Sequence, residues 1–422
     1  MFVVRSERGT SMAMLTPSVL LRTIGSLFGL ALAAGCVTAG SPGPESIGAF
    51  QLGPVCAYES LRFDGSIGTG RLNGCRRDGP ETFTLYIHPE DAPINPSSWY
   101  AFSLTSDTQT HLDLTLAYAH GRHRYAPHIS SDGGQTWRTI DRIEGADTDR
   151  ASFGLDIAPG TTLISAQPRR NLADRQAWID GIAAMPGVTR TRYGTSEQGR
   201  SLDGLEFGAE DKPALILIGG QHPPEVRGAI AMESFVERLL EDDRLARAFR
   251  EQFRVVLGPV INPDGIAEGH WRHNSRGVDV NRDWGPFTQA ETRSFKDWID
   301  GRVFPIAFLD FHGTWNSVLY TSPDEGEGDR NWFPGAFHAS LTEVLGEDAP
   351  ARVQGHNAGS SVAKNWFHET YAIPTITYEV SDAVPLEAVL SRARLSAEIT
   401  MRLLLEGPPD QPDDAQDGEI PK

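Results

Sequence analysis

The 422-residue chain is poor in basic side chains relative to acidic ones. Lys and Arg together number 38, Asp and Glu together number 56, and the formal net charge is -18. A protein that neutralises nucleic-acid phosphates normally carries a basic patch, so this charge argues against nucleic acid as a partner. It is typical instead of a soluble, self-repelling surface.

The apolar stretch near the N-terminus is too short to span a bilayer easily. This stretch, IGSLFGLALAA, follows Arg22 and has roughly the length of a signal-peptide core. It ends in LAAGC, which resembles a bacterial lipoprotein signal, and in such signals the cysteine, here Cys36, is lipidated and becomes the mature N-terminus. An ordinary secretory signal cut near Ala34 is the alternative. We therefore expect residues 1–36 to be a signal peptide, and the protein to be exported and lipid-anchored in the cell envelope.

Cysteine is scarce, because the chain has only Cys36, Cys56 and Cys75. With Cys36 assigned to lipidation, the remaining two suit one disulfide in an exported chain. A metal site at these cysteines is the weaker alternative, because no other Cys or paired His lies nearby in the sequence.

Composition divides the rest of the chain into segments without internal repeats. Small and proline-rich residues 37–47 are interpreted as a flexible linker. Short alternating runs with polar turns in residues 48–168 predict a small antiparallel β-sandwich domain. Its scattered histidines are interpreted as surface residues: His111, His120, His123 and His128. The acidic, proline-rich residues 407–422 predict a disordered tail.

Residues 169–406 alternate between strand-like and helix-like patterns. The run ALILIGG is typical of a strand buried on both faces. It precedes a helical segment from Pro224 to about Leu240, and further helices are expected at 331–345, 361–371 and 386–405. Additional strands are expected at FRVVLGPV, PIAFLDFH and PTITYEV. This order predicts an α/β domain with a mixed, mostly parallel sheet flanked by helices.

His222 and Glu225 follow the first of these strands directly, at the sheet edge where open α/β folds bind ligands. We expect Pro224 to lie in the first turn of a helix that brings Glu225 beside His222. One nitrogen and one carboxylate suit zinc, although such a pair occurs about once by chance, and a helix-capping loop is the alternative.

Two further predicted strands end in candidate functional residues at the same edge of the sheet. His312 ends the run PIAFLDFHG and is a candidate third zinc ligand. Glu379 ends IPTITYEV, and a carboxylate at the end of a buried strand is costly unless it is bound or working.

Five short motifs then occur in order: HPPE, NPDG, VDVNRDW, DFHG and TYEV. Together they resemble the zinc carboxypeptidase family over roughly residues 169–405. The segments NPSSWYAFSL, SSDGGQTW and TTLISAQP resemble the N-terminal β-domain of the cytosolic-carboxypeptidase branch, whose known members trim glutamate from protein tails. The predicted export departs from the name of that branch.

The resemblance implies a zinc-dependent carboxypeptidase that acts on a peptide or protein C-terminus with a free carboxylate. His222, Glu225 and His312 would bind Zn²⁺, and Glu379 would be the general base. The resemblance also implies that Arg272 stabilises the oxyanion, with Arg276 as the alternative. Asn281 and Arg282 would bind the terminal carboxylate, and Asp279 would orient a ligand histidine.

Two positions depart from the family or bear on its specificity. Asn357 stands where the substrate-binding tyrosine of the family is expected, and Lys364 stands where the family sets its preference for the last side chain. A buried ammonium there would favour an acidic C-terminal residue, and a solvent-facing lysine is the alternative. Two other functions remain open: a zinc amidase or deacylase acting on peptidoglycan stem peptides or N-acyl amino acids, and an inactive binding lipoprotein.

Overall fold

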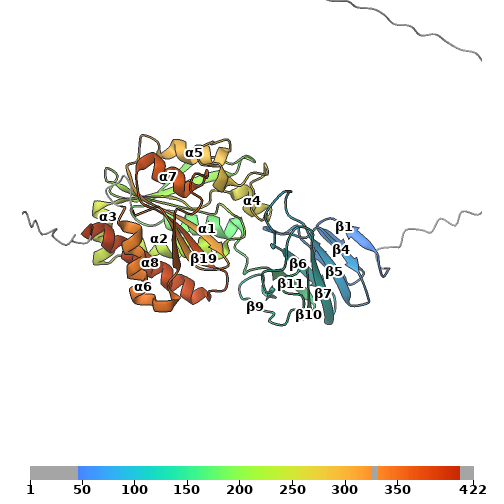
Figure 1. Cartoon of the computed structure of the whole chain (residues 1–422). Helices are drawn as coiled ribbons and strands as arrows, with labels where there is room; N and C mark the ends of the chain where they lie inside the picture. Colours follow the sequence, from blue (N-terminus) through green and yellow to red (C-terminus); the bar gives the residue numbers. More distant parts are fainter. Residues whose placement is uncertain (1–45, 325–330, 409–422) are drawn as a thin grey trace, which may run out of the picture. The chain divides into compact units, whose positions relative to one another are not determined.

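The computed structural model describes residues 46–324 and 331–408 (Figure 1). The predicted signal peptide with Cys36, most of the linker and most of the acidic tail lie outside these ranges. Within them, no helix combines the length and the apolar character needed to cross a membrane.

Two sheets between residues 50 and 165 pack face to face as the predicted sandwich. One sheet has the order β1 (Phe50–Leu52), β4 (Gly74–Arg77), β5 (Thr82–Ile87), β7 (Thr110–Tyr118) and β10 (Arg150–Ile157). The other has the order β2 (Val55–Ala57), β3 (Leu61–Asp64), β6 (Ala101–Ser106), β11 (Gly160–Ser165), β8 (His128–Ser130) and β9 (Arg138–Thr139). Aromatic side chains from both sheets fill the space between them, with the rings of Phe63 and Phe83 5.2 Å apart.

One strand pair of the sandwich departs from the antiparallel prediction. β5 and β7 pair in parallel, because the chain leaves the first sheet after β5, forms β6 in the second sheet and then returns. The other pairings within the two sheets are antiparallel.

The prediction that all four sandwich histidines are surface residues is wrong for His123. Its side chain is buried, stacks against Tyr100 and has Nδ1 3.0 Å from the hydroxyl of Tyr118. Burial lowers the pKa of His123 to about 4, so the ring is neutral at pH 7. His128 is half-buried, whereas His111 and His120 are exposed.

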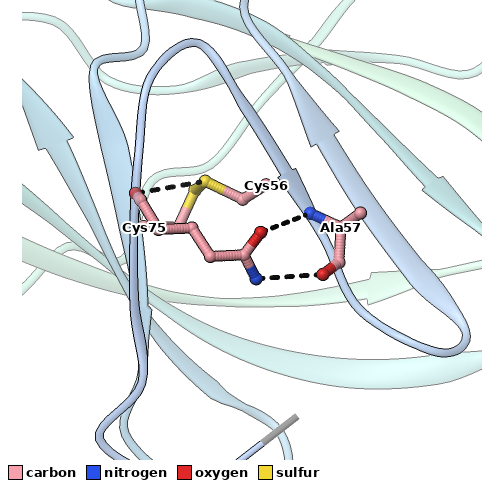
Figure 2. Close-up of a disulfide and its surroundings, with 4 residues drawn as sticks. Cys56, Ala57 and Cys75 are labelled. Carbon is pink, nitrogen blue, oxygen red and sulfur yellow. Dashed lines mark hydrogen bonds between the residues drawn. A yellow bond between two sulfur atoms is a disulfide. The ribbon is translucent and has the colours of Figure 1, made fainter. Parts of the chain in front are cut away.

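The predicted disulfide is present and links the two sheets. Cys56 of β2 and Cys75 of β4 are bonded, with their Cα atoms 6.1 Å apart (Figure 2). Beside it, the side chain of Gln51 accepts a hydrogen bond from the backbone N–H of Ala57 and donates one to the Ala57 carbonyl, both at 2.9 Å. The edge strands β1 and β2 are thereby held together next to the covalent link.

Replacing both cysteines by alanine should lower the free energy of unfolding of the sandwich by about 3 kcal/mol. The bond closes a loop over a sequence separation of 19, and opening it returns conformational freedom to the unfolded chain. The measurement is the urea midpoint of the oxidised protein against the double variant, with reduced wild type as the control. An unchanged midpoint would contradict the prediction.

The second half of the chain forms the predicted mixed sheet. Its order is β12 (Thr189–Thr195), β13 (Ser201–Gly208), β15 (Arg254–Gly258), β14 (Ala214–Gly219), β16 (Pro305–Thr314), β19 (Thr375–Ser381), β17 (Val318–Thr321) and β18 (Ala351–Gln354). The central strands β15, β14, β16 and β19 run parallel, and β12, β13 and β17 join antiparallel. β18 pairs with β17 in parallel.

Helices bury both faces of this sheet (Figure 1). One face packs against α1 (Leu172–Ala183), α2 (Val226–Leu239), α3 (Arg244–Gln252), α6 (Phe333–Leu345) and α8 (Leu386–Glu406). The other packs against α5 (Ala290–Ile299) and α7 (Ala363–Tyr371). In β14, Leu215 and Leu217 face the first group while Ile216 and Ile218 face the second, which explains why this strand is apolar throughout. Shorter helices are α4 (Pro263–Ala267), η1 (Val280–Arg282) and η2 (Gly346–Asp348).

The predicted start of α2 needs a correction. The helix begins at Val226, with Glu225 as its N-cap, and Pro224 therefore lies before the first turn. The N–H of Val226 donates to the Pro224 carbonyl at 2.8 Å, so a tight turn closes ahead of the helix. This turn leaves the Glu225 side chain at the sheet edge.

The described residues of the sandwich and of the mixed sheet belong to one compact unit. Arg124 from the sandwich forms an ion pair with Asp382, which also accepts a hydrogen bond from Gln167 at 2.8 Å. Contacts of this kind bring sandwich residues to the edge where the central strands end.

Candidate metal centre

Three side chains meet where neighbouring parallel strands end. β14 stops at Gly219, and the chain then turns into His222 and the N-cap Glu225 of α2. β16 runs beside β14 and carries His312 near its own C-terminal end. The carboxyl ends of adjacent parallel strands lie at one edge of a sheet, so residues far apart in the sequence become neighbours.

Glu225 lies between the two histidines. Its Oε1 is 2.8 Å from His222 Nδ1, and its Oε2 is 2.7 Å from His312 Nδ1. One potential ligand atom from each of the three residues lies within 4.8 Å of the others. Two imidazole nitrogens and one carboxylate oxygen are a donor set that catalytic zinc uses, with a position left open for water. The predicted His–Glu–His group therefore fits a metal ion.

Two aspartates contact the Nε2 atoms of the histidines, on the side of each ring away from Glu225. His222 Nε2 is 3.0 Å from Asp279, and His312 Nε2 is 2.8 Å from Asp310. Carboxylates in this position fix the ring and leave Nδ1 free for a metal. Sequence reasoning named Asp279 but missed Asp310, although alternate residues of a strand lie on one side and Asp310 is two residues before His312.

Electrostatic contacts connect the two histidines to the three carboxylates around them, Glu225, Asp279 and Asp310. Burial opposes protonation of both rings, yet Glu225 and Asp279 raise the pKa of His222, and Asp310 and Glu225 raise that of His312 well above its ordinary value. Burial also acts to raise the pKa of Glu225, but the two histidines outweigh it and hold that pKa well below its usual range. A bound cation would replace the Nδ1 proton of each ring and leave the Nε2 proton on its contact with aspartate, because ligand histidines are neutral.

Glu379 lies opposite His312 in the register of β16 and β19. Its Oε2 atom is buried and has no hydrogen-bond partner among the residues that the structure describes. Burial raises the pKa of Glu379 to about 7, an effect that His312 opposes and Glu225 increases. A carboxylate oxygen without a protein donor, next to a metal-capable group, is placed to exchange a proton with water.

His222, Glu225, His312 and Glu379 line a cleft of about 540 Å³. The structure brings most of the residues predicted from the sequence to it: His222, Glu225, Arg272, Asn281, Arg282, His312, Lys364 and Glu379. Asp279 lies behind them and accepts a hydrogen bond from Arg272 Nε at 2.6 Å. The rival arginine, Arg276, is exposed and contacts Glu197 instead.

Asn281 and Arg282 differ in their freedom to bind a ligand. The Asn281 side chain is buried, accepts a hydrogen bond from the N–H of Ala363 at 2.9 Å and has Nδ2 3.3 Å from His312 Nε2. Arg282 is half-exposed, donates from Nη1 to the Asn281 carbonyl at 2.7 Å and turns to the cleft. Of the pair, Arg282 is the better placed to contact a carboxylate in the cleft.

Lys364 lines this cleft and is buried, so its side chain does not face bulk solvent. Its side chain is 4% exposed, and Nζ donates to Asn365 Oδ1 at 2.8 Å. Burial lowers the pKa of Lys364 to about 8, and Glu369 partly opposes this. The ammonium is therefore charged at neutral pH in a poorly hydrated place.

Further cleft residues were not foreseen from the sequence. Tyr320 of β17 stacks on His356 with ring centroids 4.0 Å apart, next to Asn357, where the family tyrosine was expected. The sandwich adds Asn95, Ser98, Arg122, Arg124, Tyr125 and Asp147 to the lining. No local sequence pattern identifies these side chains as cleft residues. They come together only because loops of the sandwich pack next to loops of the mixed sheet.

Residues 176–384 match the zinc carboxypeptidase family. An uncharacterised protein of Zymomonas mobilis is 29% identical over 256 residues, which cover 56% of this chain and 63% of the relative. Cytosolic carboxypeptidase 6 of Mus musculus is 31% identical over 173 residues, which cover 36% of this chain and 32% of the relative. The chain thus spans less than two thirds of either relative's length.

A metallo-carboxypeptidase from Pseudomonas aeruginosa, solved in complex with (2-guanidinoethylmercapto)succinic acid, has a similar structure. The TM-score is 0.68 at 22% sequence identity, over 81% of this chain and 98% of the other. This likeness shows a shared fold. The family match confirms the resemblance drawn from the five motifs, implies zinc and indicates a hydrolase.

Proposed function

We propose that this chain, whose residues 176–384 are a zinc carboxypeptidase domain, hydrolyses the last peptide bond of a peptide or protein with a free C-terminal carboxylate. One observation carries the proposal: the metal-capable group, the carboxylate of Glu379 and the half-exposed Arg282 line a single cleft, and among the described residues the buried Oε2 of Glu379 has no hydrogen-bond partner. The metal-capable group comprises His222, Glu225 and His312.

Each side chain has a role that its position supports. A Zn²⁺ ion held by the metal-capable group would polarise the scissile carbonyl and lower the pKa of a bound water to about 7. Glu379 accepts a proton from the attacking water at Oε2 and returns it to the nitrogen of the departing residue. Arg272 donates to the oxygen on which negative charge develops, and Asp279 holds its guanidinium from behind.

Arg282 binds the terminal carboxylate of the substrate in this proposal. The planar guanidinium of arginine matches a carboxylate with two parallel hydrogen bonds, and this one is half-exposed in the cleft. Asn281 acts through its protein contacts, since its side chain is already engaged.

In this proposal, Lys364 determines which C-terminal residue the enzyme prefers. Its buried ammonium lines the cleft, and burial strengthens its attraction for an anion, because little water competes for the charge. We therefore propose that peptides ending in Glu or Asp are the preferred substrates.

Peptides that differ only in their last residue test the function and this preference together. Release of the terminal residue should be fastest for a Glu-ended peptide and slower for Lys-ended and Phe-ended ones. Hydrolysis of a muropeptide alone would point to peptidoglycan stem peptides, and no hydrolysis together with no bound zinc would point to a binding protein. Either result contradicts the proposed carboxypeptidase.

Lys364→Met should lower kcat/KM for the Glu-ended peptide roughly 10-fold to 100-fold, the size of one charge-assisted hydrogen bond. In the wild type, the ammonium is protonated below its pKa of about 8, so KM for this peptide should rise as the pH passes above 8. That rise should be absent from the variant and from reactions of a Phe-ended peptide. Lys212→Met, at an exposed position, is the control; an equal loss for both peptides would refute the role of Lys364.

A further inference from the structure

We propose that Glu90 of the sandwich is a positioning residue for Arg272, and that the sandwich is thereby part of the catalytic machinery. The inference rests on the proposed function, because Arg272 acts on the reacting carbonyl there. Glu90 itself is not among the residues that line the cleft, so its effect would reach the substrate through the residues that it holds, of which Trp271 and Arg272 line the cleft.

The carboxylate of Glu90 accepts hydrogen bonds from three consecutive backbone N–H groups. Oε2 accepts from Trp271 at 2.7 Å, and Oε1 accepts from both Arg272 and His273 at 2.8 Å. Burial acts to raise the pKa of Glu90, but these three bonds outweigh it and lower the pKa, so the group stays charged at neutral pH. A charged acceptor makes each bond stronger than a neutral one.

Neighbouring contacts fasten the same segment to the sandwich. Trp271 Nε1 donates to Asn95 at 2.6 Å, and the ring belongs to the apolar core of the sandwich. His273 Nδ1 is 2.7 Å from Asp91. Arg71 donates to the carbonyls of Gly269 and Glu268 at 2.9 and 3.1 Å.

The middle of this segment relies on Glu90 for its backbone hydrogen bonds. Residues 271–273 lie outside the helices and strands, and their N–H groups donate to Glu90 and to no backbone carbonyl of the described residues, whereas the N–H groups of His270 and Asn274 on either side do donate to carbonyls. Glu90 fixes the backbone of Arg272, and Asp279 fixes its guanidinium through Nε. With both ends fixed, the side chain enters the cleft in one orientation.

Orientation is what the reaction requires of this arginine. Loss of one donor to a developing oxyanion lowers kcat by roughly 100-fold to 1,000-fold. A displacement of about 1 Å can cost up to about 100-fold. Loosening the backbone of Arg272 should therefore slow the reaction without removing any group that contacts the substrate.

Glu90→Ala should lower kcat by roughly 10-fold to 100-fold, with KM and zinc content close to wild type. The kcat of Glu90→Gln should lie between those of wild type and Glu90→Ala, because the glutamine amide keeps one oxygen that can accept from Arg272 and His273. Glu59→Ala removes an exposed carboxylate from the same sandwich and should change nothing. Should Glu90→Ala fail to fold, Glu90→Gln carries the comparison.

A double-variant cycle with Arg272→Ala separates positioning from general stability. If Glu90 acts through Arg272, adding Glu90→Ala to Arg272→Ala should cost little further activity. Full additivity of the two losses, or unchanged kcat in Glu90→Ala, would overturn the proposal.

Hydrogen exchange tests the anchor without any substrate. The amides of residues 271–273 should exchange faster in Glu90→Ala than in the wild type, whereas the core amides of β14 should be unchanged. Unchanged protection at 271–273 would refute the anchor. If wild type hydrolysed no peptide, the proposed function would fail, and this exchange result would still decide whether Glu90 holds the segment.

Discussion

Glu379→Gln should lower kcat by a factor of about 100 to 10,000 and leave zinc bound, the loss expected when a general base is removed. Glutamine keeps the size of the side chain at the end of β19 but cannot accept a proton at neutral pH. Because His222, Glu225 and His312 are unchanged, the metal-capable group should keep its affinity for zinc.

The measurement pairs single-turnover rates on a Glu-ended peptide with zinc content after dialysis. Glu387→Gln, on the exposed start of α8, is the matched control and should behave as wild type. Retained turnover in Glu379→Gln would show that another group takes the proton. Loss of zinc together with activity would show instead that Glu379 supports the metal.

His312→Ala should abolish both stoichiometric zinc binding and peptide hydrolysis. The ring is 2% exposed and contacts Glu225 through Nδ1 and Asp310 through Nε2. Without it, two ligands remain, and catalytic zinc sites use three protein ligands. The buried Asp310 also loses its histidine partner and keeps Gln221, which donates to it at 2.7 Å.

Thermal unfolding with and without a chelator gives a readout that is independent of activity. A bound ion stabilises the folded state by about 2.7 kcal/mol when its free concentration is 100 times Kd. Chelation should therefore lower Tm of the wild type and leave Tm of His312→Ala unchanged. His111→Ala is the control, because His111 also pairs with a carboxylate, Asp156, at 2.7 Å but lies exposed on the sandwich. Stoichiometric zinc in His312→Ala would exclude His312 as a ligand.

Much of the metal centre was predictable because it is built from strand ends. His222, His312 and Glu379 each follow or end an apolar run that forms a central parallel strand, and such strands present their carboxyl ends at one edge. Secondary structure at this level depends on local periodicity, which is visible in the sequence. The start of α2 was misplaced because a tight turn at Pro224 closes before the helix, and the propensity of proline for first turns does not reveal that turn.

Other features depend on which side chains the fold brings together. Asn281 was expected to bind substrate, and only the fold shows that its side chain also lies against the N–H of Ala363 and the ring of His312. His123 was expected at the surface, but it folds back against Tyr100 and Tyr118. The composition of a short stretch carries no information about such neighbours.

The sequence by itself determined the architecture of the α/β domain, the order of its motifs, the disulfide partners and the residues able to hold a metal. These depend on periodicity, on spacing and on side-chain chemistry, which are properties of the chain. Tertiary structure alone decided that Glu90, 182 positions from Arg272, lies against its backbone, and that sandwich side chains line the cleft. Such contacts exist only after folding, because packing selects them from many chemically equivalent carboxylates and arginines.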